Sequence, residues 1–171
     1  MWNDTDIPLA VFFTVRCYGT WLHGDDRGSV DRDHNGYGTP RLTPNKPWND
    51  SKRDQMKHDP VRLNAPRRRS VRRAITETAE KRRWKILAQN VRTNHFHCVI
   101  DIGATKAKRA LGALKANATR QMREDGCWRH EHSPWAEKGS CRNLWNDRSI
   151  FEACDYVLNG QGDELPDFDW W

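Results

Sequence analysis

Residues 94–102 read Asn94-His95-Phe96-His97-Cys98-Val99-Ile100-Asp101-Ile102. Side chains alternate between the two faces of a β-strand. One face of this strand therefore carries only apolar residues, Phe96, Cys98, Ile100 and Ile102, and the other carries His95, His97, Val99 and Asp101. Because a core needs the apolar face, we expect both histidines to point away from the helices that cover it.

Weaker patterns place further elements around this strand. Residues with high β-propensity favour strands at 9–17, 84–89 and 141–145, and apolar residues at helical spacing favour helices at 70–82, 105–124 and 148–159. Asp147 is the expected N-cap of the last helix, which Gly160 ends. This order predicts an α+β fold of the split βαβ (ferredoxin- or RRM-like) type, an antiparallel sheet with helices on one face. The second face of the sheet is expected to be open.

The length of 171 residues fits one domain, and we expect residues 1–171 to form it. Residues 19–66 are rich in Gly, Pro, Asn and Asp without sustained periodicity, which predicts a long loop insertion. Residues 163–171 form an acidic tail without a basic residue.

The composition indicates the cellular setting and the class of partner. Lys and Arg number 29 against 23 Asp and Glu, a net charge of +6, and there are nine tryptophans, so a polyanion is a reasonable partner. The five cysteines show no paired spacing, which favours a reducing compartment. No apolar run approaches the length of a membrane span. We expect a soluble, cytoplasmic protein with no membrane partner.

Two histidine triplets are candidate metal ligands. His95 and His97 lie on the same strand face, close enough to share a divalent ion; the alternative is a pair of ordinary hydrogen-bonded histidines. His130-Glu131-His132 lies in a polar loop beside Pro134, with no strand pattern to fix its geometry. We interpret this second triplet as solvated loop rather than a metal site.

Tyr156 is a candidate nucleophile. Five apolar residues of the last helix share one arc of a helical wheel, and Tyr156 falls outside it, on the side of Glu152 and Asn159. A phenol oxygen can attack phosphorus if a cation neutralises the phosphate, which paired imidazoles holding Mg²⁺ or Mn²⁺ would supply. The alternative is a tyrosine that covers the rim of the core.

The combination of these motifs resembles the HUH single-tyrosine transposases, most of all the REP-associated tyrosine transposases and their insertion-sequence relatives. The resemblance rests on Asn94-His95-Phe96-His97 and, about sixty residues later, Cys154-Asp155-Tyr156-Val157-Leu158-Asn159-Gly160-Gln161-Gly162. Supporting blocks lie at 18–22, 91–95, 114–120 and 144–145.

The resemblance implies a DNA transposase that nicks and joins single-stranded DNA through a 5′-phosphotyrosine. It implies that His95 and His97 bind a divalent metal, Mg²⁺ or Mn²⁺, and that Tyr156 attacks the scissile phosphate. The family often places a further ligand about one turn after the tyrosine, where this chain has Gly160 followed by Gln161. Gln161 is therefore the expected third ligand, with Glu152, one turn earlier, as the alternative.

Basic residues then become candidate contacts to hairpin-forming single-stranded DNA. Residues 51–73 contain nine Lys and Arg against two Asp. The candidates are Arg67, Arg68, Arg69, Arg72, Arg73, Lys108, Lys115, Arg120 and Arg123. The protein could act as a monomer or a homodimer. Two rival functions stay open: a non-catalytic nucleic-acid-binding module on the same sheet, and a metal-dependent hydrolase without a covalent step.

Overall fold

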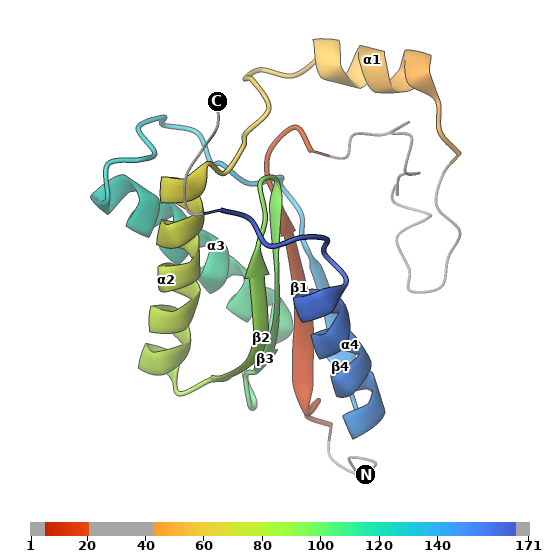
Figure 1. The fold of residues 1–171 in the computed structure, drawn as a ribbon, viewed down its shortest axis with the longest axis vertical. Helices are drawn as coiled ribbons and strands as arrows, with labels where there is room; N and C mark the ends of the chain where they lie inside the picture. The colour runs from red at the N-terminus through yellow and green to blue at the C-terminus, as the bar shows by residue number, and fades with distance from the viewer. Residues whose placement is uncertain (1–5, 21–42, 167–171) are drawn as a thin grey trace.

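The computed structural model describes residues 6–20 and 43–166, and its centre is a four-stranded antiparallel sheet with the strand order β2-β3-β1-β4 (Figure 1). In chain order the elements are β1 (Ala10–Arg16), α1 (Lys46–Asp54), α2 (Ala65–Arg82), β2 (Lys85–Val91), β3 (His95–Asp101), α3 (Ala107–Glu124), β4 (Ser140–Leu144) and α4 (Asp147–Asn159). The predicted α+β fold with an antiparallel sheet is confirmed.

The inner strand β3 separates two layers of packing. Phe96, Cys98 and Ile100 are fully buried in a large core on the side of α2 and α3. Val99 belongs instead to a smaller apolar cluster that includes Ala153 and Val157 of α4. The alternation expected from residues 94–102 is therefore confirmed.

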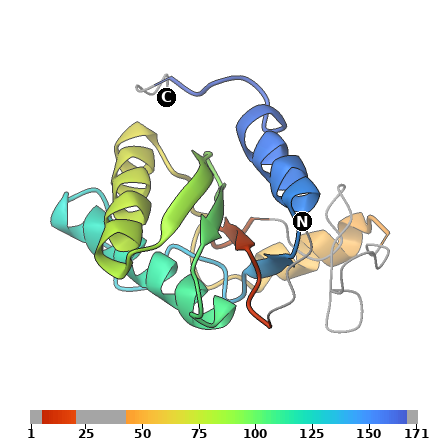
Figure 2. The same cartoon turned by 90° about the horizontal axis from the view of Figure 1, so that it is seen from below.

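Helices cover both faces of the sheet, so the expectation of an open second face is wrong. Figure 2 shows α2 and α3 on one side of the sheet and α4 on the other. The apolar face of α4 explains this placement, because Ala153 and Val157 pack against Ala88 of β2 and Val99 of β3. The helix that carries Tyr156 thus lies on the histidine face of the sheet.

The first expected helix starts earlier than the sequence pattern predicted, at Ala65 rather than at 70. The Asn64 side chain accepts a hydrogen bond from Arg67 N at 3.2 Å, which satisfies one free amide of the first turn. Pro66 occupies the first turn, where its missing N–H is not needed.

The segment expected to be a long loop, 19–66, also contains regular structure. The helix α1 begins after Asn45, whose side chain accepts a hydrogen bond from Trp48 N at 3.0 Å. Near the C-terminal end of this segment, Val61 and Leu63 are buried in the large core. Residues 21–42 of this expected loop, and 167–171 of the expected acidic tail, lie outside the described residues.

The N-cap of α4 is Asn146, so the prediction of Asp147 at this position is wrong. Asn146 has extended backbone angles, and its side chain accepts a hydrogen bond from Ser149 N at 2.9 Å. Asp147 is the first helical residue, where a carboxylate also interacts favourably with the helix dipole. Gly160 ends the helix as predicted.

The longest described helices are α2 and α3, and charged residues recur along both of them. Within residues 6–20 and 43–166, no helix combines the length and the apolar character needed to cross a membrane.

Candidate active site

The strand β3 brings two imidazole rings together on the side of α4. The ring centroids of His95 and His97 lie 4.6 Å apart. β1 holds the strand in register on one side, where Arg16 pairs with His95 and Thr14 pairs with His97. The pairing places both rings at the end of the sheet where β1 finishes and β3 begins.

The Nδ1 atom of each histidine has a partner within the protein. His95 Nδ1 lies 2.7 Å from Asn94 Oδ1, and His97 Nδ1 lies 2.9 Å from Thr14 Oγ1. Contacts of this kind orient the ring and fix its tautomer in metal-binding histidines. Nε2 is then the nitrogen through which each ring can reach a ligand.

His97 is held in the neutral form that a metal ligand requires. Its side chain is buried, with 6% of the residue exposed. Burial, and to a lesser extent the neighbouring His95, lower the pKa of His97 from 6.5 to about 4, although a hydrogen bond with the Phe13 backbone acts in the opposite direction. At neutral pH the His97 imidazole therefore carries no charge.

Gln161 completes a group of three possible ligands. Its Oε1 lies 3.1 Å from His95 Nε2, and its amide nitrogen donates to Tyr156 O at 3.3 Å, which turns the amide oxygen toward the imidazole. Glu152, the alternative ligand, accepts a hydrogen bond from Arg148 at 2.9 Å instead. The structure brings Gln161, and not Glu152, to the histidine pair.

The donor set fits a divalent ion. Asn94 Oδ1 and Gln161 Oε1 are both acceptors, and a neutral His95 can donate to only one of them. When His95 Nδ1 carries the proton, the lone pair of His95 Nε2 faces the oxygen of Gln161. Two lone pairs repel each other, and a cation bound to both atoms would remove that repulsion. Imidazole nitrogens and amide oxygens are both groups through which a protein can hold a divalent ion. Among the described residues no three His, Cys, Asp or Glu side chains gather to hold an ion, so the ligands here would be two imidazoles and an amide.

Tyr156 lies beside the histidines. Its ring centroid is 5.5 Å from that of His97 and 6.0 Å from that of Phe12. The helix buries Ala153 and Val157 and leaves Tyr156 47% exposed, as expected from its place outside the apolar arc. The phenol is therefore next to the imidazoles and open to solvent, where a large substrate could reach it.

Three side chains hold the end of α4 and the segment after it against the rest of the fold. Asn90 Nδ2 donates to Val157 O at 2.9 Å, and Arg92 donates to Asp163 O at 2.8 Å. Arg68, which is only 3% exposed, donates to Pro166 O at 2.6 Å. These contacts fix the path of the chain on both sides of Gln161. Sequence reasoning missed Asn90, and it placed Arg92 in a block of the resemblance without assigning it a role.

Several of the candidate DNA-binding residues have partners inside the protein. Arg67 donates to Cys127 O and Arg62 O, and Arg68 also donates to Leu63 O. Lys115 and Arg123, both on α3, donate to backbone carbonyls of the loop that follows the helix. These four residues stabilise the loops around the sheet. Lys108 is exposed, and Arg120 is exposed and pairs with Glu124 at 3.3 Å.

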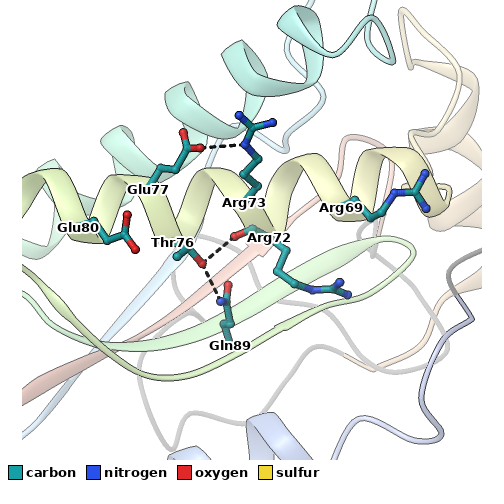
Figure 3. Close-up of a pocket in the computed structure, with 7 residues that line it drawn as sticks. All are labelled: Arg69, Arg72, Arg73, Thr76, Glu77, Glu80 and Gln89. Atoms are coloured by element: carbon teal, nitrogen blue, oxygen red, sulfur yellow. Dashed lines mark hydrogen bonds and ion pairs between the residues drawn. The ribbon is translucent and has the colours of Figure 1, made fainter.

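The remaining arginines line an open pocket of about 430 Å³ between α2 and β2 (Figure 3). Arg69, Arg72 and Arg73 lie along its helical side, and Gln89 reaches it from β2. Arg73 pairs with Glu77 at 2.8 Å, and Gln89 donates to Thr76 Oγ1 at 3.1 Å. The pocket is therefore basic on the side of Arg69 and Arg72.

Residues 56–157 match the family of IS200-like transposases. The chain belongs to this family. The match contains His95, His97 and Tyr156, and it confirms the resemblance to the HUH single-tyrosine transposases. It ends before Gln161, which the structure alone brings to the site.

Two solved structures are similar to this IS200-like transposase. One is a REP-associated tyrosine transposase bound to a REP hairpin, with 14% identity and a TM-score of 0.45, covering 92% of this chain and 69% of that one. The other is a candidate transposase from Deinococcus radiodurans, with 12% identity and a TM-score of 0.44, covering 95% of this chain and 98% of that one. No curated protein matches the chain.

Proposed function

We propose that this transposase cuts and joins single-stranded DNA with Tyr156 as the nucleophile. The phenol oxygen attacks the scissile phosphorus and its proton passes to solvent. The bond from phosphorus to the 3′ oxygen breaks, which leaves a 5′-phosphotyrosine and a free 3′-OH. Attack of a 3′-OH on the phosphotyrosine reverses the step and joins two strands. The observation that carries this proposal is the 5.5 Å separation of the Tyr156 and His97 rings.

His95, His97 and Gln161 would hold the divalent ion, Mg²⁺ or Mn²⁺. A cation bound there neutralises charge on the phosphate and stabilises the leaving 3′ oxygen. Support comes from the neutral state of His97 and from the spacing of His95 Nε2 and Gln161 Oε1. Asn94 and Thr14 would orient the two imidazoles.

The proposed substrate is single-stranded DNA that folds into a hairpin. The net charge of +6 and the arginines of α2 favour contact with a phosphate backbone. Arg69 and Arg72 lie at the basic side of the pocket in Figure 3, and both are exposed, as is Lys108. Arg73 and Arg120 are exposed too, but each pairs with a glutamate of its own helix. Arg67, Arg68, Lys115 and Arg123 would act less directly, by holding the loops that border the DNA.

A nicking assay on short hairpin oligonucleotides tests the proposal and separates it from its rivals. With Mg²⁺ or Mn²⁺, electrophoresis under denaturing conditions should reveal both a nicked strand and a product linked to protein, and EDTA should abolish both. Binding without any nick would indicate a non-catalytic nucleic-acid-binding module. A nick without a protein-linked product would indicate a metal-dependent hydrolase that uses water.

A further inference from the structure

Three rings outside the candidate active site gather beyond the end of β1. His58 and His132 lie face to face, with centroids 3.8 Å apart and planes within 8° of parallel. The Tyr18 ring approaches both, at 5.9 Å from His58 and 6.1 Å from His132. We call Tyr18, His58 and His132 the histidine stack. His132 comes from the second histidine triplet, and its ring is packed rather than freely solvated.

Hydrogen bonds hold the stack in shape. The Tyr18 backbone donates to Pro134 O at 2.8 Å and accepts from Val61 N at 2.9 Å. The Tyr18 hydroxyl also accepts from Lys57 N at 3.0 Å. The two loops that supply His58 and His132 are thereby anchored on Tyr18. A ligand would meet rings that are already in place, so binding would cost little ordering entropy.

The stack has a buried side and an exposed side. Trp128 is 2% exposed, and its ring meets the His132 ring edge-on at 5.3 Å. Trp128 Nε1 donates to His132 O at 3.1 Å. The His130 ring also packs near His132, with centroids 5.2 Å apart. His58 stacks on His132 and is exposed to solvent. The outer face of His58 is therefore an aromatic surface that faces outward.

The stack lies at the same end of the sheet as the candidate active site. Arg16, the last residue of β1, pairs with His95, and Cys17 N donates to Asn94 O at 2.9 Å. Tyr18 follows two residues after Arg16, about 7 Å farther along an extended chain. In Figure 1 the segments after β1, before α2 and after α3 run together at this end of the sheet.

Positive charge borders the stack. The Arg67 guanidinium lies over the Trp128 ring, 5.0 Å from its centroid. Arg123 binds the carbonyls of His130 and Glu131, next to His132. Both arginines thus lie on the Trp128 and His132 side of the stack, where they bind backbone carbonyls. The exposed ring of His58 suits a nucleobase, because bases stack on aromatic rings.

We propose that the histidine stack binds an unpaired nucleobase of the single-stranded DNA substrate, by stacking it on the outer face of His58. This inference rests on the proposed function, since it takes single-stranded DNA as the substrate. Every base presents a π-face, so the stack contributes affinity and placement of the strand without selecting a sequence.

Binding measured in EDTA tests this proposal without any chemistry. Fluorescence anisotropy compares a labelled hairpin that carries a short single-stranded tail on either end with the same hairpin whose tail is abasic. His58→Ala should weaken binding of the base-bearing tail by about tenfold, a loss typical of one stacked base, and leave the abasic tail unaffected. His58→Phe, which keeps a ring but no imidazole, should retain the wild-type affinity.

Three results would overturn the proposal. The first is an unchanged affinity of His58→Ala for the base-bearing tail. The second is an equal loss on the abasic tail, which would mean that the stack acts on the backbone. The third is a loss in His58→Phe, which would assign the effect to imidazole charge. Because no metal is present, these results do not depend on whether Tyr156 forms an adduct.

Discussion

The rings of His97 and Tyr156 lie 5.5 Å apart, although one comes from the inner strand β3 and the other from the last helix. The smaller apolar cluster explains this proximity, because it packs α4 against the histidine face of the sheet. Because Ala153 and Val157 pack on the sheet, the neighbouring Tyr156 side chain lies beside the imidazoles while it stays partly exposed. The packing of α4 on the sheet therefore determines where the candidate nucleophile lies.

The buried, neutral His97 should make the protein less stable in acid. Its folded pKa of about 4 lies below the unfolded value of 6.5, so the unfolded chain takes up the proton first as the pH falls. The resulting loss of stability begins below pH 6.5 and reaches about 3 kcal/mol at pH 4. Urea unfolding at pH 7 and pH 4 measures it. His97→Asn, whose side chain cannot titrate, should lose correspondingly less free energy of unfolding between the two pH values. An equal loss in the variant and the wild type would contradict the lowered pKa of His97.

Gln161 should control metal affinity. Gln161→Ala removes an oxygen ligand and should weaken Mn²⁺ binding by about tenfold, while Gln161→Glu adds a charged ligand and should strengthen it. Titration calorimetry with Mn²⁺ measures both. Glu152→Gln is the matched control, because Glu152 is paired with Arg148, and its Mn²⁺ affinity should equal that of the wild type. A loss in Glu152→Gln with none in Gln161→Ala would reverse the roles of the two residues.

Arg92 should act as a positioning residue for Gln161. Arg92→Ala removes the hydrogen bond to Asp163 O and frees the segment after α4. We expect Mn²⁺ affinity to fall several-fold and amide hydrogen exchange to rise in residues 161–166. Arg148→Ala, which breaks an exposed ion pair on α4, should do neither. Faster exchange with unchanged Mn²⁺ affinity would show that the contact supports the segment but not the ligand.

The N-cap of α4 should contribute measurably to stability. Asn146→Ala leaves the Ser149 amide without its side-chain partner and should cost about 1 kcal/mol in chemical unfolding. Asp147→Ala loses a favourable charge near the helix N-terminus but no capping bond, so its cost should be smaller. The opposite ranking would place the cap at Asp147.

The strand part of the site could be predicted from the sequence because a strand has a period of two. Once Phe96 and Cys98 are assigned to the core, the opposite orientation of His95 and His97 follows without further information. The start of α2 was also within reach, since an Asn followed by a Pro at the first turn is a recognised helix-start signal, which Asn64 and Pro66 supply.

The rest of the site depends on contacts that no local pattern encodes. Helical periodicity indicates that α4 has an apolar face, but it does not indicate which surface of the protein that face covers. The packing of α4 against Val99 could therefore not be predicted. Gln161 reaches His95 only because the chain turns after Gly160, passes through Gly162 at a φ of 80° and is held there by Arg92. His58 and His132 come from two separate loops, and their stacking follows from the anchoring on Tyr18.

Tyr156, the proposed nucleophile, should become covalently linked to DNA. Incubating the protein with a hairpin oligonucleotide and Mn²⁺, digesting both chains and sequencing the modified peptide by mass spectrometry tests it most directly. We predict a nucleotide attached through a 5′-phosphate to Tyr156, and no modified peptide from Tyr156→Phe, which should still bind the DNA. A nucleotide attached to any other residue, or an adduct that persists in Tyr156→Phe, would contradict the account.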